Sequence, residues 1–280
     1  MSGNNMQFNG DNGVRGDTNY NGTNYVAWNW KAGGSGSANT DGTINSTVST
    51  NTTAGFSIVT YTGYGSASTV GHGLGAVPKM IIVKKRSGSG YDESWYVYHE
   101  ALGNTHTLGL NSTGGSSDVN VWNDTTPTSS VFSVGNDSTN RSGNEFVAYC
   151  FAEKTGYSKF GKVISNGSDD GTFSYTGFAP KWVMLKPTVS DGWSNWYIFD
   201  TTRDTNLNDK PLYANLNTRE AYYGGSPATN YAQIDMLSNG FKIRRGSAWG
   251  GGGNGTELIY MAFGQSIVAV SYTHLRAHET

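Results

Sequence analysis

Pro78-Lys79-Met80-Ile81-Ile82-Val83-Lys84 is a run of apolar and β-branched residues that the chain contains twice. The second copy reads Pro180-Lys181-Trp182-Val183-Met184-Leu185-Lys186. Three more motifs recur in the same order: Gly55–Val59 as Gly156–Phe160, Trp95–His99 as Trp196–Asp200, and Glu145–Phe151 as Glu257–Phe263. This self-similarity indicates a module of about a hundred residues that occurs twice in tandem.

The apolar runs have the length and spacing of β-strands. Runs of about four to eight residues alternate with clusters of Gly, Ser, Asn and Asp, which is typical of all-β proteins. The expected strands are 56–61, 80–84, 95–99, 130–134 and 145–152 in the first module, and 158–164, 182–186, 196–199, 240–244 and 257–263 in the second. Short antiparallel strands favour sandwiches. We therefore predict an all-β protein of two tandem sandwich-like units, residues 55–155 and 156–268.

Three further segments lie outside the two modules. Residues 1–34 resemble the last two strands of an incomplete preceding repeat, since Val26-Ala27 matches Val147-Ala148. Residues 35–54 are rich in Gly, Ser, Thr and Asn, and we expect a flexible linker there. Residues 269–280 resemble a translated sequencing-adapter peptide and are interpreted as a non-native tail, with a short natural tail as the alternative.

Composition narrows the possible functions. Only 14% of the 280 residues are charged and the formal net charge is −2, so we expect no nucleic-acid partner. No run approaches the ~18 apolar residues of a membrane helix, so we expect no membrane insertion. Cys150 is the single cysteine, which excludes an intrachain disulfide, and its apolar surroundings predict a buried side chain rather than a nucleophile.

Four stretches carry a family resemblance: Tyr25–Gly34, Thr53–Gly63, Val70–Lys84 and Asp235–Lys242. Through them the chain resembles repeat modules of tail-fibre and other virion proteins of environmental tailed bacteriophages, over roughly residues 6–267. It implies location in the virion, in a tail fibre or appendage, with other virion proteins and a host-surface glycan or receptor as partners. Virion fibres are often homotrimers, so a homo-oligomer is a further expectation. The motifs mark strands and turns, so the resemblance carries over no catalytic residues and no cofactor.

Few side chains are candidates for catalysis, metal binding or ligand binding. His72 and His99 are interpreted as structural, because no cluster has the spacing of metal ligands, and we predict no metal site. No pair of carboxylates recurs as a glycosidase would require. Aromatic residues in polar loops without a counterpart in the other module are the candidate ligand-binding residues, and the alternative is that they pack on the rim of the sandwich. These residues are Trp122, Trp193, Tyr222, Tyr223 and Trp249.

These observations favour a non-enzymatic structural and adhesive module that presents loops for contact with the host surface. A polysaccharide depolymerase is the alternative, and a buried acid pair in a cleft between the units would favour it. A carbohydrate-binding module of a larger enzyme is the third interpretation.

Overall fold

The computed structural model describes residues 24–90, 94–135, 137–190, 194–203, 210–218, 220, 234–244 and 253–264. The chain divides into two compact units, Met1–Lys31 and Ala32–Thr280. In the first unit, residues 24–31 form neither strand nor helix, so the strand expected over these residues is wrong. The other strand expected in residues 1–34, and the tail at residues 269–280, lie outside the described residues.

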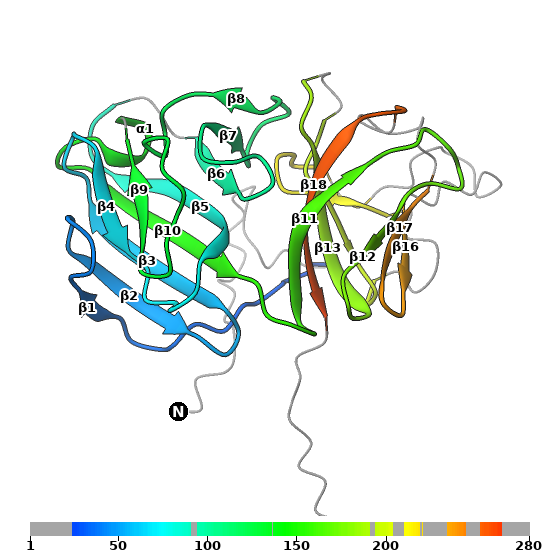
Figure 1. Cartoon of the computed structure of the whole chain (residues 1–280), viewed down its shortest axis with the longest axis horizontal. Helices are drawn as coiled ribbons and strands as arrows, with labels where there is room; N and C mark the ends of the chain where they lie inside the picture. The colour runs from blue at the N-terminus through cyan, green and yellow to red at the C-terminus, as the bar shows by residue number, and fades with distance from the viewer. Residues whose placement is uncertain are drawn as a thin grey trace, which may run out of the picture. The chain divides into compact units, whose positions relative to one another are not determined.

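The first repeat is built on an antiparallel sheet of eight strands in the order β1-β2-β3-β10-β5-β6-β7-β8 (Figure 1). A second, two-stranded sheet pairs β4 with β9, and one short helix, α1 (Asp137–Asn140), precedes β10. The strand bounds are β1 Ser37–Asn39, β2 Ser46–Asn51, β3 Phe56–Thr62, β4 Ser68–Gly71, β5 Pro78–Ser87, β6 Trp95–His99, β7 His106–Gly109, β8 Ser117–Asp118, β9 Val131–Val134 and β10 Glu145–Ala152.

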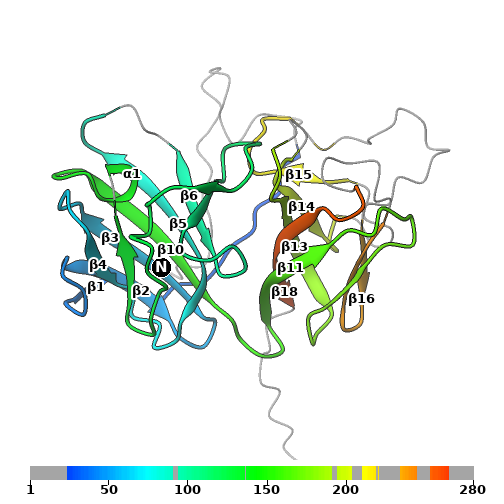
Figure 2. The ribbon, with the colours of Figure 1, turned by 45° about the horizontal axis from the view of Figure 1, so that its top comes forward.

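The second repeat is built on a five-stranded sheet in the order β11-β18-β13-β14-β15 and a three-stranded sheet in the order β12-β17-β16. Figure 2 shows β16 to one side of the larger sheet. The strand bounds are β11 Ser158–Ile164, β12 Phe173–Tyr175, β13 Pro180–Pro187, β14 Tyr197–Asp200, β15 Leu212–Tyr213, β16 Ile234–Leu237, β17 Gly240–Ile243 and β18 Glu257–Gly264.

The sequence repeat is also a repeat of topology. The order β3-β10-β5-β6-β7 in the first repeat matches β11-β18-β13-β14-β15 in the second. The register agrees as well, because Glu145 pairs with Thr62 in the first repeat and Glu257 pairs with Ile164 in the second. The regular secondary structure is nearly all β, with 46% of residues in strands and 1% in helix, which confirms the predicted all-β, sandwich-like fold.

Each large sheet packs one face against the smaller sheet of its own repeat. In the first repeat, Val59, Ile81 and Ala148 belong to the same buried cluster as Val70 and Phe132 of the β4-β9 sheet. In the second, Val183 and Leu258 share a cluster with Phe241 of β17 and Ile234 of β16. The alternation of strand side chains places every second residue on this face.

The opposite faces of the two large sheets bury apolar side chains at the junction of the repeats. The Phe151 ring lies 6.4 Å from that of Phe160 and 6.2 Å from that of Phe263, centroid to centroid. Beyond the other end of β13, the Ser116 amide donates to the Thr188 carbonyl oxygen at 2.9 Å. Strands such as β13 are therefore buried on both faces, which explains why Pro180–Pro187 is almost continuously apolar.

The segment predicted as a flexible linker is instead part of the fold. Residues 37–39 and 46–51 form β1 and β2, and β2 pairs with β3 along its whole length. Val48 is 5% exposed and Ile44 is 8% exposed, and both belong to the core cluster of the first repeat. The prediction failed because an edge hairpin is held mainly by backbone hydrogen bonds to β3, so it needs only a few apolar anchors.

Candidate functional site

The predicted aromatic binding residues are not brought together in the described part of the chain. Trp122 is 1% exposed and packs edge-on against Tyr98, with ring centroids 5.8 Å apart. Its ring has no free face for a ligand, which corrects the expectation of an exposed loop residue. The neighbouring residues are mostly polar, but the indole is large and apolar and extends from this loop into the core. The predicted residues Trp193, Tyr222, Tyr223 and Trp249 lie outside the described residues.

Two buried histidines have the structural role that the sequence predicts. In each, Nδ1 accepts the amide two residues on, Leu74 for His72 and Ala101 for His99, both at 3.2 Å. The other ring nitrogen therefore carries the proton and donates to a carbonyl oxygen. The acceptor is Thr128 O at 3.2 Å for His72 and Tyr260 O at 3.1 Å for His99.

Burial suppresses the charge of both imidazoles. Desolvation lowers the pKa of His99 to about 4, opposed by the bond to Tyr260 O and by the charge of Glu100. Desolvation also lowers the pKa of His72, opposed by the bond to Thr128 O and by the charge of Asp41. Both side chains are thus neutral hydrogen-bonding groups near pH 7.

One acidic side chain in the described residues is buried and serves local structure. Asp200 is the one buried carboxylate among them, and it accepts the amides of Thr202 and Arg203 and the Arg203 guanidinium. No group of three or more His, Cys, Asp or Glu side chains in the described ranges could hold a metal ion. Nor does any described helix have the length and apolar character needed to cross a membrane.

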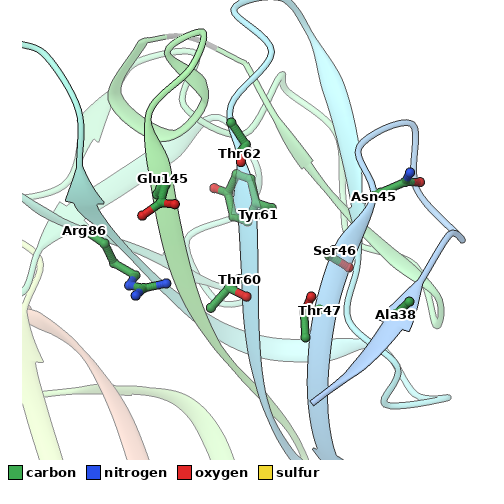
Figure 3. Close-up of a pocket in the computed structure, with 9 residues that line it drawn as sticks. All are labelled: Ala38, Asn45, Ser46, Thr47, Thr60, Tyr61, Thr62, Arg86 and Glu145. Carbon is green, nitrogen blue, oxygen red and sulfur yellow. The ribbon is translucent and has the colours of Figure 1, made fainter.

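A polar pocket of about 320 Å³ opens on the first repeat (Figure 3). Strands β2, β3 and β10, together with β1 and the end of β5, supply its walls. Its lining residues are Ala38, Asn45, Ser46, Thr47, Thr60, Tyr61, Thr62, Arg86 and Glu145. The volume falls in the range of about 300–1,000 Å³ that is usual for small-molecule sites.

Strand register explains how the hydroxyl groups gather. Thr47 of β2 is directly opposite Thr60 of β3, and Thr62 of β3 is directly opposite Glu145 of β10. Residues two apart on a strand share a face, so these four side chains lie on one face of the sheet. Arg86, on the neighbouring strand β5, completes this row of polar groups (Figure 3).

The two charged groups of the pocket come from adjacent strands. Ser87 Oγ donates to Glu145 Oε2 at 2.8 Å, which orients the carboxylate. Arg86 and Glu145 form no ion pair with each other, and both side chains are solvent-exposed. The pocket therefore offers one cationic donor, one anionic acceptor and several hydroxyls.

The end of the sheet beside the pocket is held by buried side chains. Asn144 is 2% exposed, accepts the Ser89 amide at 3.0 Å and donates to the Ser89 carbonyl oxygen at 2.7 Å. The Tyr61 hydroxyl donates to Thr139 O at 2.7 Å. These bonds fix the loop that follows β5 and the helix α1 that precedes β10, both at the end of the sheet where Glu145 lies.

The second repeat has a different surface at the equivalent place. Strand register aligns Lys162 with Thr60, Ile164 with Thr62 and Glu257 with Glu145. Lys162 Nζ lies 2.7 Å from Glu257 Oε2, so an ion pair occupies this face. Within the described residues, β11 also has no outer neighbour corresponding to β2.

The pocket can bind hydrogen-bonding ligands, and its lining holds a single carboxylate rather than an acid pair. Sequence reasoning missed it because its walls come from segments that only strand pairing joins, including the segment predicted as a linker. The available signal was the period-two spacing of hydroxyl residues at 47 and 49 and at 60 and 62.

Fold and site together define an all-β protein of two sandwiches, free of intrachain disulfides, with a polar pocket on one of them. The family model described as "Domain of unknown function (DUF7483)" matches residues 2–266, and the chain belongs to this family. No curated protein and no solved structure matches the chain significantly.

Proposed function

We propose that the chain is a non-enzymatic structural and adhesive module of a phage tail fibre or appendage. Its location is then the virion, its partners are other virion proteins and a host-surface glycan or receptor, and it assembles as a homo-oligomer. The described scaffold serves to hold a recognition surface in a fixed geometry.

The observation that carries this proposal is the burial of both large sheets at the junction of the repeats. Lys186 is 0% exposed, and its Nζ donates to Gly114 O of the first repeat at 2.9 Å and to Ser194 O of the second at 2.7 Å. Trp196 Nε1 donates to Gly109 O at 2.8 Å, again between repeats. Bonds of this kind, together with aromatic packing, give a rigid scaffold without disulfides, as an extended appendage requires.

The chemistry at this junction also supports a non-enzymatic role. Its described polar groups include the Lys186 ammonium, the neutral His99 imidazole and the Trp196 indole N–H, all of which donate hydrogen bonds to carbonyl oxygens. Asp200 is engaged with Arg203. Glycoside hydrolysis requires two positioned acids, and the described residues contain no buried pair.

The test is a binding assay of the full chain on host cells and on a glycan array, with released reducing sugar measured in the same samples. Saturable binding without sugar release is the expected result. Release of sugar would overturn the non-enzymatic proposal, and absence of binding to every host surface would overturn the adhesive one.

A further inference from the structure

We propose that the pocket of the first repeat binds one neutral, polyhydroxylated sugar residue, and that the β1–β2 hairpin creates this site. The inference deepens the adhesive function proposed above and rests on it. It assigns the binding to the first repeat, although the two repeats share one topology.

The hairpin supplies the wall that the second repeat lacks. Ala38 of β1 and Thr47 of β2 are opposite each other in the hairpin, and Thr47 is in turn opposite Thr60. Without β2, the face carrying Thr60 and Thr62 would end at the sheet edge. With it, the hydroxyls of two strands form a concave surface on which a ring-shaped ligand can sit.

The charges of the pocket favour a neutral ligand. Arg86 donates hydrogen bonds only, and the Glu145 carboxylate accepts them. A phosphate or sulfate would gain from Arg86 but would be repelled by Glu145. Sugar hydroxyls both donate and accept, so a single sugar residue can satisfy the guanidinium, the carboxylate and the threonine hydroxyls together.

The second repeat provides the contrast. There the acid is retained as Glu257, but Lys162 in place of Thr60 neutralises it directly at 2.7 Å. Ile164 in place of Thr62 removes a hydroxyl. The same strands therefore form a closed ion pair in one repeat and an open polar pocket in the other.

The experiment titrates the full chain with glucose, galactose, mannose, N-acetylglucosamine, glucuronic acid and inorganic phosphate, using saturation-transfer NMR and calorimetry. We expect binding of at least one neutral sugar. The variant Thr60→Lys copies the ion pair of the second repeat and should abolish it. Glu145→Gln should weaken it about tenfold, because it removes a charge-assisted hydrogen bond. Lys162→Thr is the matched control and should leave affinity unchanged, since no hairpin wall stands beside it.

The outcomes separate the inference from the broader function. Unchanged sugar affinity in both Thr60→Lys and Glu145→Gln overturns the pocket assignment, as does binding of phosphate or glucuronic acid in preference to neutral sugars. Host-cell binding that survives Thr60→Lys, while sugar binding is lost, also overturns the pocket as the adhesive site but leaves the adhesive function standing. If the parent chain binds sugar but binds no host surface, the sugar site is supported and the proposed adhesive function is overturned.

Discussion

The His99 imidazole of the first repeat donates from Nε2 to the Tyr260 carbonyl oxygen of the second repeat at 3.1 Å. Its Nδ1 is already occupied as the acceptor of the Ala101 amide. The equivalent residue of the second repeat, Asp200, also accepts the amide two residues on, from Thr202. The residue at this position caps the following turn in both repeats. In the first repeat, where it is His99, it also donates a hydrogen bond to the second repeat.

We expect acid to weaken the fold through His99. Burial lowers the pKa of its imidazole to about 4 in the folded chain, against an ordinary value of about 6.5. Above pH 6.5 this imidazole is mostly neutral in both the folded and the unfolded chain. Between pH 6.5 and 4 only the unfolded state binds the proton, so the free energy of unfolding falls by up to about 3 kcal/mol as the pH drops.

Urea denaturation at a series of pH values measures this effect. His99→Gln cannot titrate, so its unfolding free energy should depend less on pH in this window. The pKa of His72 is also lowered by burial, and His72 should supply the slope that remains. Equal slopes for the parent and His99→Gln would contradict the assignment.

Lys186→Met should destabilise the junction of the repeats. The Lys186 ammonium has three N–H groups, and four carbonyl oxygens surround it: Gly114, Pro187 and Ser194 at 2.7–3.0 Å and Thr113 at 3.4 Å. Each buried acceptor left without a donor costs about 1–3 kcal/mol, so we expect a loss of more than about 2 kcal/mol. Lys84 is the equivalent residue of the first repeat, with Nζ 5.7 Å from the Trp95 ring centroid.

The control for this prediction is Lys84→Met. It removes a half-buried cation–π contact and should cost less than about 1 kcal/mol. Chemical denaturation of both variants, with limited proteolysis near the junction, provides the comparison. A Lys84→Met variant as unstable as Lys186→Met would show that the four-carbonyl arrangement is not the source of the effect.

Trp122→Ala should cost about 3–5 kcal/mol, because it removes a large side chain from the core. Trp122→Phe should cost much less. Within the described part of the chain, Trp122 Nε1 is buried without a hydrogen-bond partner, and phenylalanine keeps most of the ring while removing that N–H. Thermal unfolding of both variants tests this, and a loss of glycan binding by a fully folded Trp122→Phe would argue for a ligand role instead.

The Cys150 thiol should resist modification in the folded protein. It is 0% exposed, and burial raises the pKa of its thiol far above the ordinary range. The reactive species is the thiolate, so a disulfide reagent such as DTNB should label the chain only as it unfolds. Rapid labelling under native conditions would show that the strand opens locally.

Val48→Asp tests whether β2 is an integral part of the fold. Val48 is 5% exposed in the core of the first repeat, so a buried charge there should cost about 3 kcal/mol or more. Thr52→Asp, at an exposed position just beyond β2, should change stability by less than about 0.5 kcal/mol. Equal stabilities would restore the interpretation of residues 35–54 as a linker.

Several features of the structure follow from local sequence alone. The runs at residues 80–84 and 182–186 form the centres of β5 and β13, and the burial of Cys150 follows from its position inside an apolar strand. The period of strand side chains is local, so it can be read without knowing the partner strand. The recurrence of the motifs indicates the two tandem repeats.

The candidate site could not be predicted in the same way. Trp122 looks like a loop residue in sequence, yet its ring fills the core beside Tyr98. Thr47 and Glu145 are far apart along the chain and are brought to one pocket by β3, which pairs with both β2 and β10. Strands pair through backbone hydrogen bonds, which most side chains permit. An edge strand of polar residues therefore has no clear signal in the sequence.

The sequence by itself determined the all-β class, the two repeats and the absence of an intrachain disulfide, because apolar periodicity, recurrence and a single cysteine are properties of the chain alone. Only the tertiary structure decided that residues 37–51 complete the first sheet, that His99 and Lys186 join the repeats, and that a polar pocket opens beside Glu145. These features depend on which backbone groups and side chains meet across long sequence separations, and that is settled by packing of the whole fold rather than by any local pattern.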